Sequence, residues 1–131
     1  MKRVVLGLWM VAGCVLFWAS LVEAAESRTL TGEYVWNRDG TRGALEAVFT
    51  PAGEGSWEVV FYANFNDRRV TYEGTARGSL SEGSLQGEVK SQSRRQTYRF
   101  SGTFDEGSFE GTHSEVRRGS DRPLGTLTLG R

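Results

Sequence analysis

The sequence predicts an all-β domain, most simply an eight-stranded antiparallel up-and-down barrel preceded by an N-terminal signal helix. Three observations lead to this fold class. Apolar and polar residues alternate along most of the chain after residue 25, which is the period of a half-buried strand. Turn-forming residues interrupt the alternation at short intervals. Cys14 is the only cysteine, so the domain has no disulfides and depends on packing for its stability.

The first element expected is a secretory signal peptide over residues 1–24. A basic start, an uncharged apolar run over residues 4–22 and small residues before the expected cut after Ala24 are typical of one. The run is long enough for an uncleaved membrane anchor, and VAGC resembles the lipobox of bacterial lipoproteins, which would place a lipid on Cys14. All three alternatives predict that residues 25–131, a single domain, are exported to the periplasm or secreted.

Turn segments divide the remaining chain into eight expected strands with hairpin-length connections. In GSWEVVFYANF, for example, Trp57, Phe61 and Phe65 share one face and polar residues take the other. The expected strands cover residues 29–37, 43–51, 55–65, 69–80, 84–92, 96–104, 108–116 and 124–130. Such short connections require antiparallel neighbours, and eight strands close most simply into a barrel filled by side chains. A two-layer β-sandwich is the alternative, and RRGSDRP is the connection where a departure from a meander would enter.

The aromatic face is expected to point into the barrel, because the other face is charged on nearly every strand. This arrangement is the opposite of a transmembrane barrel, so the barrel is expected to be water-soluble. The aromatic residues on the inner face are Tyr34, Trp36, Phe49, Trp57, Phe61, Phe65, Tyr72, Tyr98, Phe100, Phe104 and Phe109.

A glycine-rich phrase occurs twice, as GSLSEGSLQGEV from residue 78 and GTFDEGSFEGTH from residue 102. Each copy is predicted to be a hairpin, with Leu80 paired to Leu85 and Phe104 paired to Phe109 across the turn. Similar pairings in the other hairpins (Trp36 to Leu45, Phe65 to Val70, Val89 to Tyr98) place an inward glycine opposite an inward phenylalanine three times. The predicted glycine pairs are Gly32–Phe49, Gly74–Phe61 and Gly87–Phe100. A ring over a bare glycine restores packing and helps to fix the register.

Residues 100–113 resemble a MORN repeat, and residues 76–89 match its pattern more loosely, so the resemblance covers residues 76–113 only. It departs from the pattern where Ala76 replaces the leading aromatic residue and where Val89 and His113 replace a later glycine. The resemblance implies no catalytic residue. The meander is similar to avidin, lipocalin and fatty-acid-binding barrels at the level of fold.

Charge and composition exclude several kinds of function. Removal of residues 1–24 leaves 14 basic and 15 acidic residues, which disfavours a nucleic-acid partner. The acidic residues fall on the outer face or in turns, and no metal-ligand spacing is present. His113 is expected on the inner face opposite Phe100, where a structural role or a ligand contact is favoured over catalysis. We therefore expect no enzyme activity and no cofactor.

Two surfaces are candidate binding sites. In an eight-strand meander, the turns after the third, fifth and seventh strands meet at one rim, where arginines could bind an anionic ligand, and His113 is a further candidate contact. The rim arginines are Arg68, Arg69, Arg94, Arg95, Arg117 and Arg118. An outward apolar patch that could bind a protein partner consists of Val35, Val48, Val60 and Tyr62.

These features predict an exported, non-catalytic binding module of the bacterial cell envelope, which engages an anionic ligand or a protein partner at the arginine rim. The alternatives are a carrier of a small apolar ligand inside the barrel and a secreted inhibitor or structural envelope protein. Contact with a membrane is expected only through the N-terminal segment, if that segment is retained.

Overall fold

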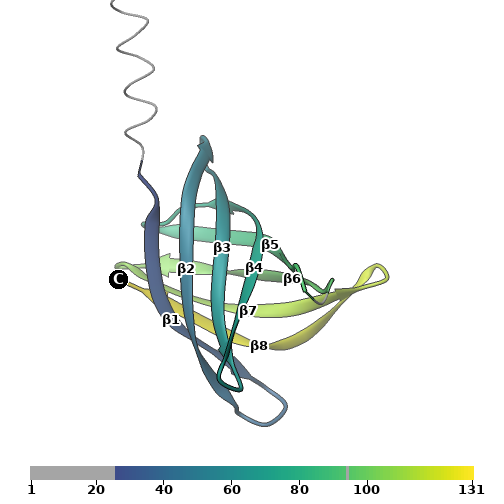
Figure 1. Ribbon diagram of the computed structural model, residues 1–131. Coiled ribbons are helices and arrows are strands. Elements are labelled where there is room, and N and C mark those ends of the chain that lie inside the picture. Colours follow the sequence, from purple (N-terminus) through teal and green to yellow (C-terminus); the bar gives the residue numbers. More distant parts are fainter. Residues whose placement is uncertain (1–25, 94) are drawn as a thin grey trace, which may run out of the picture.

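The computed structural model describes residues 26–93 and 95–131, which form a closed antiparallel barrel of eight strands (Figure 1). Each strand pairs with its neighbours in sequence, and β8 pairs with β1 to close the barrel. The strands are β1 (Arg28–Trp36), β2 (Arg42–Gly53), β3 (Ser56–Phe65), β4 (Arg68–Gly78), β5 (Gly83–Ser91), β6 (Thr97–Asp105), β7 (Ser108–Arg117) and β8 (Ser120–Gly130). The predicted barrel is confirmed and the alternative β-sandwich is wrong.

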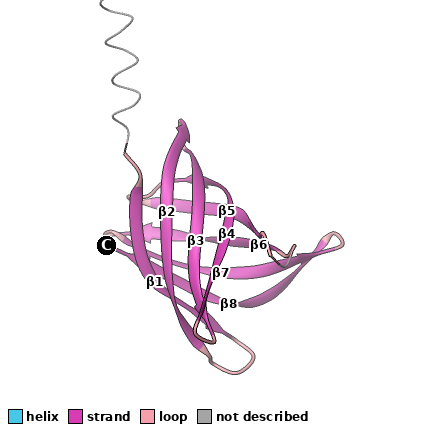
Figure 2. Cartoon of the chain, viewed as in Figure 1, coloured by secondary structure: helices cyan, strands magenta, loops and turns pink. Residues whose placement is uncertain are grey.

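The predictions for the N-terminal segment lie outside the described residues. These are the signal helix and signal peptide over residues 1–24, the anchor over residues 4–22 and the lipid on Cys14. Within residues 26–93 and 95–131 there are strands and turns (Figure 2), and no helix in that part of the chain could cross a membrane.

The two halves of the barrel cross at a steep angle. In Figure 1, β1 to β4 run nearly upright and β5 to β8 run across them. Glycines permit the sharp coiling that this requires, because adjacent backbones approach closely at their Cα atoms. A Cβ atom on Gly74 would lie 1.8 Å from the carbonyl oxygen of Glu88, and one on Gly125 would lie 1.7 Å from that of Val35. No side chain fits at either position.

The predicted inner face is confirmed as the core. Phe49 and Phe109 are completely buried, and Phe100 and Phe104 nearly so. All of the predicted inward aromatic residues belong to the buried cluster or pack against it. The remaining members of the buried cluster are Leu30, Leu45, Ala47, Val59, Ala63, Ala76, Leu80, Leu85, Val89, Leu127 and Leu129. Most of these side chains fill the half of the barrel away from the pocket described below, whereas Leu45, Ala63, Val89 and Leu127 line that pocket.

The predicted register of β5, β6 and β7 is confirmed. Phe104 pairs with Phe109 across the two-residue turn Glu106–Gly107, both of which have positive φ. Val89 pairs with Tyr98, so Gly87 faces Phe100, whose ring covers it: a Cβ on Gly87 would lie 2.6 Å from the Cζ atom of that ring. In this hairpin the proposed packing of an aromatic ring over glycine occurs.

The other three predicted pairings are wrong because their turns differ in length or in position from the predicted ones. Phe65 pairs with Arg68 and not with the predicted partner Val70, because Asn66 and Asp67 both adopt positive φ and form a tight two-residue turn. As a result, Phe61 pairs with Tyr72 and not with Gly74.

At the β4–β5 turn the loop has the predicted length but lies one residue earlier. Leu85 pairs with Gly78 and not with Leu80, because the Ser79 N–H donates to the Ser84 carbonyl at 3.0 Å. The Ser79 hydroxyl also accepts hydrogen bonds from the backbone N–H groups of Ser81 and Glu82 (both 3.1 Å), which stabilises this loop.

In the first hairpin, Trp36 donates its backbone N–H to the Thr41 carbonyl at 2.9 Å, which closes a shorter loop than expected. Leu45 therefore pairs with Gly32 and not with Trp36, and Phe49 pairs with Arg28, so the predicted Gly32–Phe49 contact does not form. The expected long seventh connection is also absent: Arg117 pairs with Ser120 across the turn Arg118–Gly119.

Candidate functional site

The barrel has two chemically different ends. The turns after β1, β3, β5 and β7 lie at one end, which we call the arginine end because those turns or the strand ends beside them carry arginine in every case. The turns after β2, β4 and β6 lie at the other end together with the C-terminus, and they carry Glu54, Glu82 and Glu106 with no basic residue. The turns at the arginine end also contain Asp39 and Asp67, so the strand order gives that end an excess of basic residues and does not separate the two signs completely.

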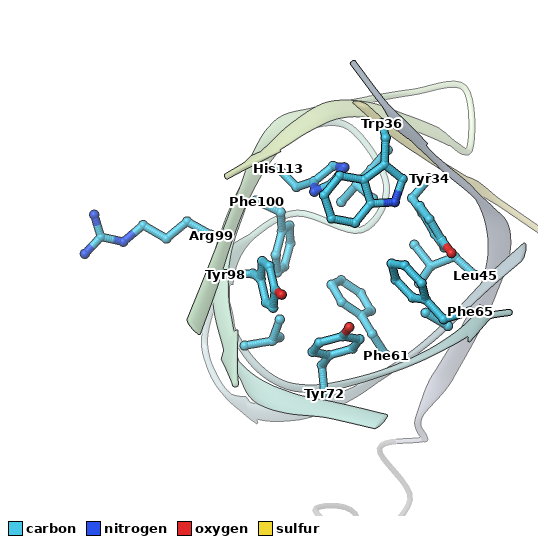
Figure 3. A pocket seen from close by; sticks show the side chains of 13 residues that line it. Tyr34, Trp36, Leu45, Phe61, Phe65, Tyr72, Tyr98, Arg99, Phe100 and His113 are labelled. Atoms are coloured by element: carbon cyan, nitrogen blue, oxygen red, sulfur yellow. The ribbon is translucent and has the colours of Figure 1, made fainter. Parts of the chain in front are cut away.

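An apolar pocket opens at the arginine end. It has a cavity volume of about 60 Å³, well below the 300–1,000 Å³ typical of sites that enclose a small molecule. Figure 3 shows the rings around the space, with the Arg99 side chain directed away from it. The lining residues are Tyr34, Trp36, Leu45, Phe61, Ala63, Phe65, Tyr72, Val89, Tyr98, Arg99, Phe100, His113 and Leu127.

The mouth of the pocket is a ring of aromatic side chains that are only partly buried. Phe65 stacks on Tyr34, with centroids 5.3 Å apart and planes 21° apart, and Trp36 meets the edge of Phe65 at 5.7 Å. Across the opening, Tyr72 and Tyr98 form an edge-to-face pair at 5.3 Å. Trp36, Phe65, Tyr72 and Tyr98 pack on the core without being enclosed by it. These contacts give the mouth a fixed shape.

A hydrogen bond fixes Tyr34 in the wall of the pocket. Its hydroxyl donates to the Asn64 carbonyl at 2.6 Å, which links β1 to β3 across the interior. Burial raises the pKa of Tyr34, with a smaller contribution from Tyr72, so the hydroxyl stays neutral at physiological pH.

The floor of the pocket is closed by core side chains. Phe61 and Phe100 meet there with centroids 5.0 Å apart, and Phe109 lies beyond Phe100 at 6.4 Å. Leu45, Ala63 and Val89 are each less than a tenth exposed. A ligand group that enters from the mouth therefore meets an apolar floor and cannot pass through the barrel.

His113 forms part of the pocket wall, as its predicted position opposite Phe100 implies. Its ring meets Trp36 edge to face at 5.8 Å. The Nε2 atom is buried near Gly125 and makes no hydrogen bond among the described residues. Burial lowers the pKa of His113, and the nearby Val35 carbonyl opposes that shift only in part. The imidazole is therefore neutral at pH 7, and the wall carries no charge at this position.

Glu115, two residues after His113, does not interact with the imidazole and forms an ion pair with Arg117. The Glu115 carboxylate accepts a hydrogen bond from Nε of Arg117 at 3.0 Å, in an ion pair at the barrel wall. Within residues 26–93 and 95–131, no group of three or more His, Cys, Asp or Glu residues could hold a metal ion.

The predicted rim arginines lie in two different environments. Arg69 is held on the outer wall, where it contacts Glu46 at 3.3 Å and covers the Tyr62 ring at 4.4 Å, and Arg117 is paired with Glu115. Arg68, Arg95 and Arg118 are exposed and form no ion pair with any described residue. Arg94 lies outside the described residues.

The rim is broad, because its turns point in different directions. In Figure 1 the β7–β8 turn projects far from the β1–β2 and β3–β4 turns. The arginines therefore surround the end of the barrel and do not form one compact cluster.

The predicted apolar patch divides into two parts. Val48 pairs directly with Val60 across β2 and β3, and Tyr62 follows on the same face under Arg69. Val35 lies apart from them, between Arg42 on β2 and Thr126 on β8. All four are half-buried.

A larger hollow, of about 500 Å³, lies on the outer surface over β4 to β8. Its lining is mainly polar, and Arg99 neutralises Glu88 and Asp121 there, each at 3.1 Å. We place the candidate site in the inner pocket, because that pocket opens into an apolar space surrounded by aromatic rings that are only partly buried.

Sequence reasoning identified the pocket residues as inward but did not group them as a site. The grouping depends on the tight β1–β2 and β3–β4 turns, which hold Trp36 and Phe65 at the ends of their strands. Asn66-Asp67, two residues that tolerate positive φ, was the signal that could have indicated the short β3–β4 turn.

No protein-family model matches this chain. No curated protein is significantly similar to it either.

Proposed function

We propose that this protein is an exported, non-catalytic binding module that receives a small apolar group in the aromatic pocket at the arginine end of the barrel. The proposal rests mainly on one observation. The rest of the interior is filled, whereas the ring of Trp36, Phe65, Tyr72 and Tyr98 surrounds an open apolar space. Partly exposed aromatic surface around a hollow is typical of a binding site.

The pocket size distinguishes this proposal from a carrier that encloses its ligand. A cavity of about 60 Å³ has room for a group of a few non-hydrogen atoms. The ligand therefore inserts one end and leaves the remainder outside the barrel. Export agrees with the N-terminal sequence, and a binding module of the cell envelope remains the role we propose.

The test is binding of a homologous series of 1-alkanols to the protein as its own cells produce it, followed by NMR of the Trp36 indole N–H. Each methylene that enters the pocket contributes about 0.8 kcal/mol, or about fourfold in affinity. We expect this gain for the first few carbons and then a plateau. The Trp57 indole, which donates to the Gly78 carbonyl at the opposite end, is the internal control and should not shift.

A pocket-filling variant provides the matched control. Ala63→Leu places three additional carbon atoms in the cavity that Ala63 lines, and it should abolish the Trp36 shift without loss of thermal stability. If the alkanols shift Trp57 as much as Trp36, or if Ala63→Leu binds them as well as the natural protein does, the pocket is not the site.

A further inference from the structure

The geometry points to a ligand class for this pocket: an anion that carries a short alkyl group, with the apolar end in the pocket and the charge among the rim arginines. This inference rests on the proposed function and adds to it the charge and orientation of the ligand. Two independent features carry it, namely the uncharged interior of the pocket and the excess of arginine at its end.

Among the described residues, the pocket lining directs no charged group into the space. The hydroxyls of Tyr72 and Tyr98 point toward the space (Figure 3), and that of Tyr98 donates to Oε1 of Gln96 at 2.7 Å. Arg99 is the one charged residue among the described residues of the lining, and its guanidinium points outward to bind Glu88 and Asp121 (Figure 3). The Tyr34 hydroxyl is already bound to the Asn64 carbonyl, and His113 is neutral. A charged group without a partner would lose its hydration there, so the charged part of any ligand stays outside.

The end at which the pocket opens favours an anion over a cation. Five exposed arginines on its turns and adjoining strand ends form no ion pair with a described residue, whereas the opposite turns carry glutamate alone. The five are Arg38, Arg68, Arg95, Arg118 and Arg122. Guanidinium groups bind carboxylate, sulfonate and phosphate through paired N–H donors. The resulting field attracts an anionic headgroup and repels an ammonium group.

The competing ligand is an alkylammonium ion. Aromatic rings attract cations through their faces, and the mouth presents several such rings. The mouth and the rim thus favour opposite charges. The rim determines the sign of the charge on the preferred ligand, because its arginines carry full charges, whereas the attraction between the aromatic rings and a cation acts only at short range.

The experiment compares three probes of equal chain length, pentanoate, 1-pentanol and pentylammonium, by NMR titration of the Trp36 indole at low salt. We expect pentanoate to bind about three- to tenfold more tightly than pentanol, and pentylammonium to bind more weakly than pentanol. The advantage of pentanoate should shrink to less than about twofold at 0.5 M NaCl, because salt screens exposed charges.

Arginine variants locate the headgroup. Arg68→Gln combined with Arg118→Gln removes two of the five unpaired charges from different sides of the rim, so it should reduce the advantage of pentanoate over pentanol and leave pentanol binding unchanged. The matched control, Arg28→Gln combined with Arg131→Gln, removes the same charge from the opposite end and should change neither affinity.

The possible outcomes distinguish the proposal that the pocket is a binding site from the inference that its ligand is an anion. If pentanol binds as tightly as pentanoate, or if pentylammonium binds most tightly, the pocket remains a binding site and the inferred anion is wrong. If none of the three probes shifts Trp36, the proposed function itself is wrong. Equal loss of pentanoate affinity in both arginine double variants would also overturn the inference, because the anion would then respond to net charge and not to the rim.

Discussion

Single atoms decide the shape of this barrel at its glycines. Gly74 has an ordinary φ, so its identity is required by space and not by backbone conformation. The Glu88 carbonyl occupies the position that a Cβ atom would take, and a main-chain atom in a paired strand cannot rotate away. The same close approach recurs at Gly125 against Val35.

We predict that Gly74→Ala lowers the free energy of unfolding by at least about 2 kcal/mol, the cost of forcing apart a packed region. Chemical denaturation followed by circular dichroism measures it. Gly130→Ala is the matched control, because the nearest atom to a Cβ at Gly130 is 3.8 Å away; it should change stability by less than about 0.5 kcal/mol. Equal stability of the two variants would show that the strands do not approach closely at Gly74.

His113 gives the protein a specific dependence on pH. Its pKa is lowered by burial, so below the ordinary histidine value of about 6.5 the unfolded chain binds a proton more readily than the folded chain does. The contribution of His113 to stability is therefore complete above that value and is lost as pH falls through the pKa of the folded state.

We predict that His113→Phe reduces the loss of stability between pH 7 and pH 5 relative to the natural protein. Parallel denaturation curves at several pH values measure the difference in stability between the two proteins. Carboxylates that titrate in both proteins contribute equally, so their contributions cancel in this difference. Identical pH profiles would mean that the imidazole is solvated in the folded protein.

At the level of individual residues, the sequence predicted which side chains point inward but not which inward residues form a site. The alternation of apolar and polar residues is sufficient to predict which side chains point inward. A two-residue period fixes the face of Phe100 or His113 regardless of the register with the neighbouring strand. The pocket depends also on how far along the barrel each ring lies. That distance is set by the turns and not by the period.

Among the elements, the β3–β4 hairpin shows how a turn sets the position of a strand. Asn66 has a φ of 47° and Asp67 a φ of 64°, the left-handed values that a tight two-residue hairpin turn requires. Phe65 and Arg68 pair immediately beside this turn, so Phe65 lies at the mouth of the pocket.

We predict that Asp67→Val destabilises the protein by about 1–2 kcal/mol, because a β-branched residue is strained at positive φ. Asp67→Gly, which relaxes the same φ, should be neutral or stabilising. Thermal melts of the two variants measure the contrast. Equal melting temperatures of the valine and glycine variants would show that the turn does not have the left-handed geometry. The four-residue loop predicted from the sequence would then be the better description of this hairpin.

The predicted register succeeded in β5 to β7 and failed in the three other hairpins for which a register was predicted, for a physical reason. Leu80 and Leu85 look equivalent to Phe104 and Phe109 in the repeated phrase, but the Ser79 hydroxyl accepts hydrogen bonds from two backbone N–H groups, and the turn lies one residue earlier than in the second copy. A side-chain hydrogen bond of this kind is local and weakly encoded in sequence. Strand number, by contrast, depends on many residues together and was predicted correctly.

The whole molecule combines a filled barrel with one unfilled end. Phe49, Phe104 and Phe109 close the interior on one side, whereas the rings of Trp36, Phe65, Tyr72 and Tyr98 remain partly exposed on the other. The strand order places acidic turns at the closed end and arginines at the open one. An eight-stranded barrel can fold without either the difference in packing or the difference in charge between its two ends. Here the loosely packed end and the arginine-rich end are the same end.

The most direct test of this account is an NMR measurement of contacts between 1-pentanol and the aromatic rings of the protein. We predict nuclear Overhauser effects from the terminal methyl group of pentanol to Trp36, Phe65 and Phe61, and none to Trp57 or Phe104 at the other end. Contacts spread over both ends, or confined to the outer surface at Val48 and Val60, would contradict the claim that the open aromatic end of the barrel is a binding site.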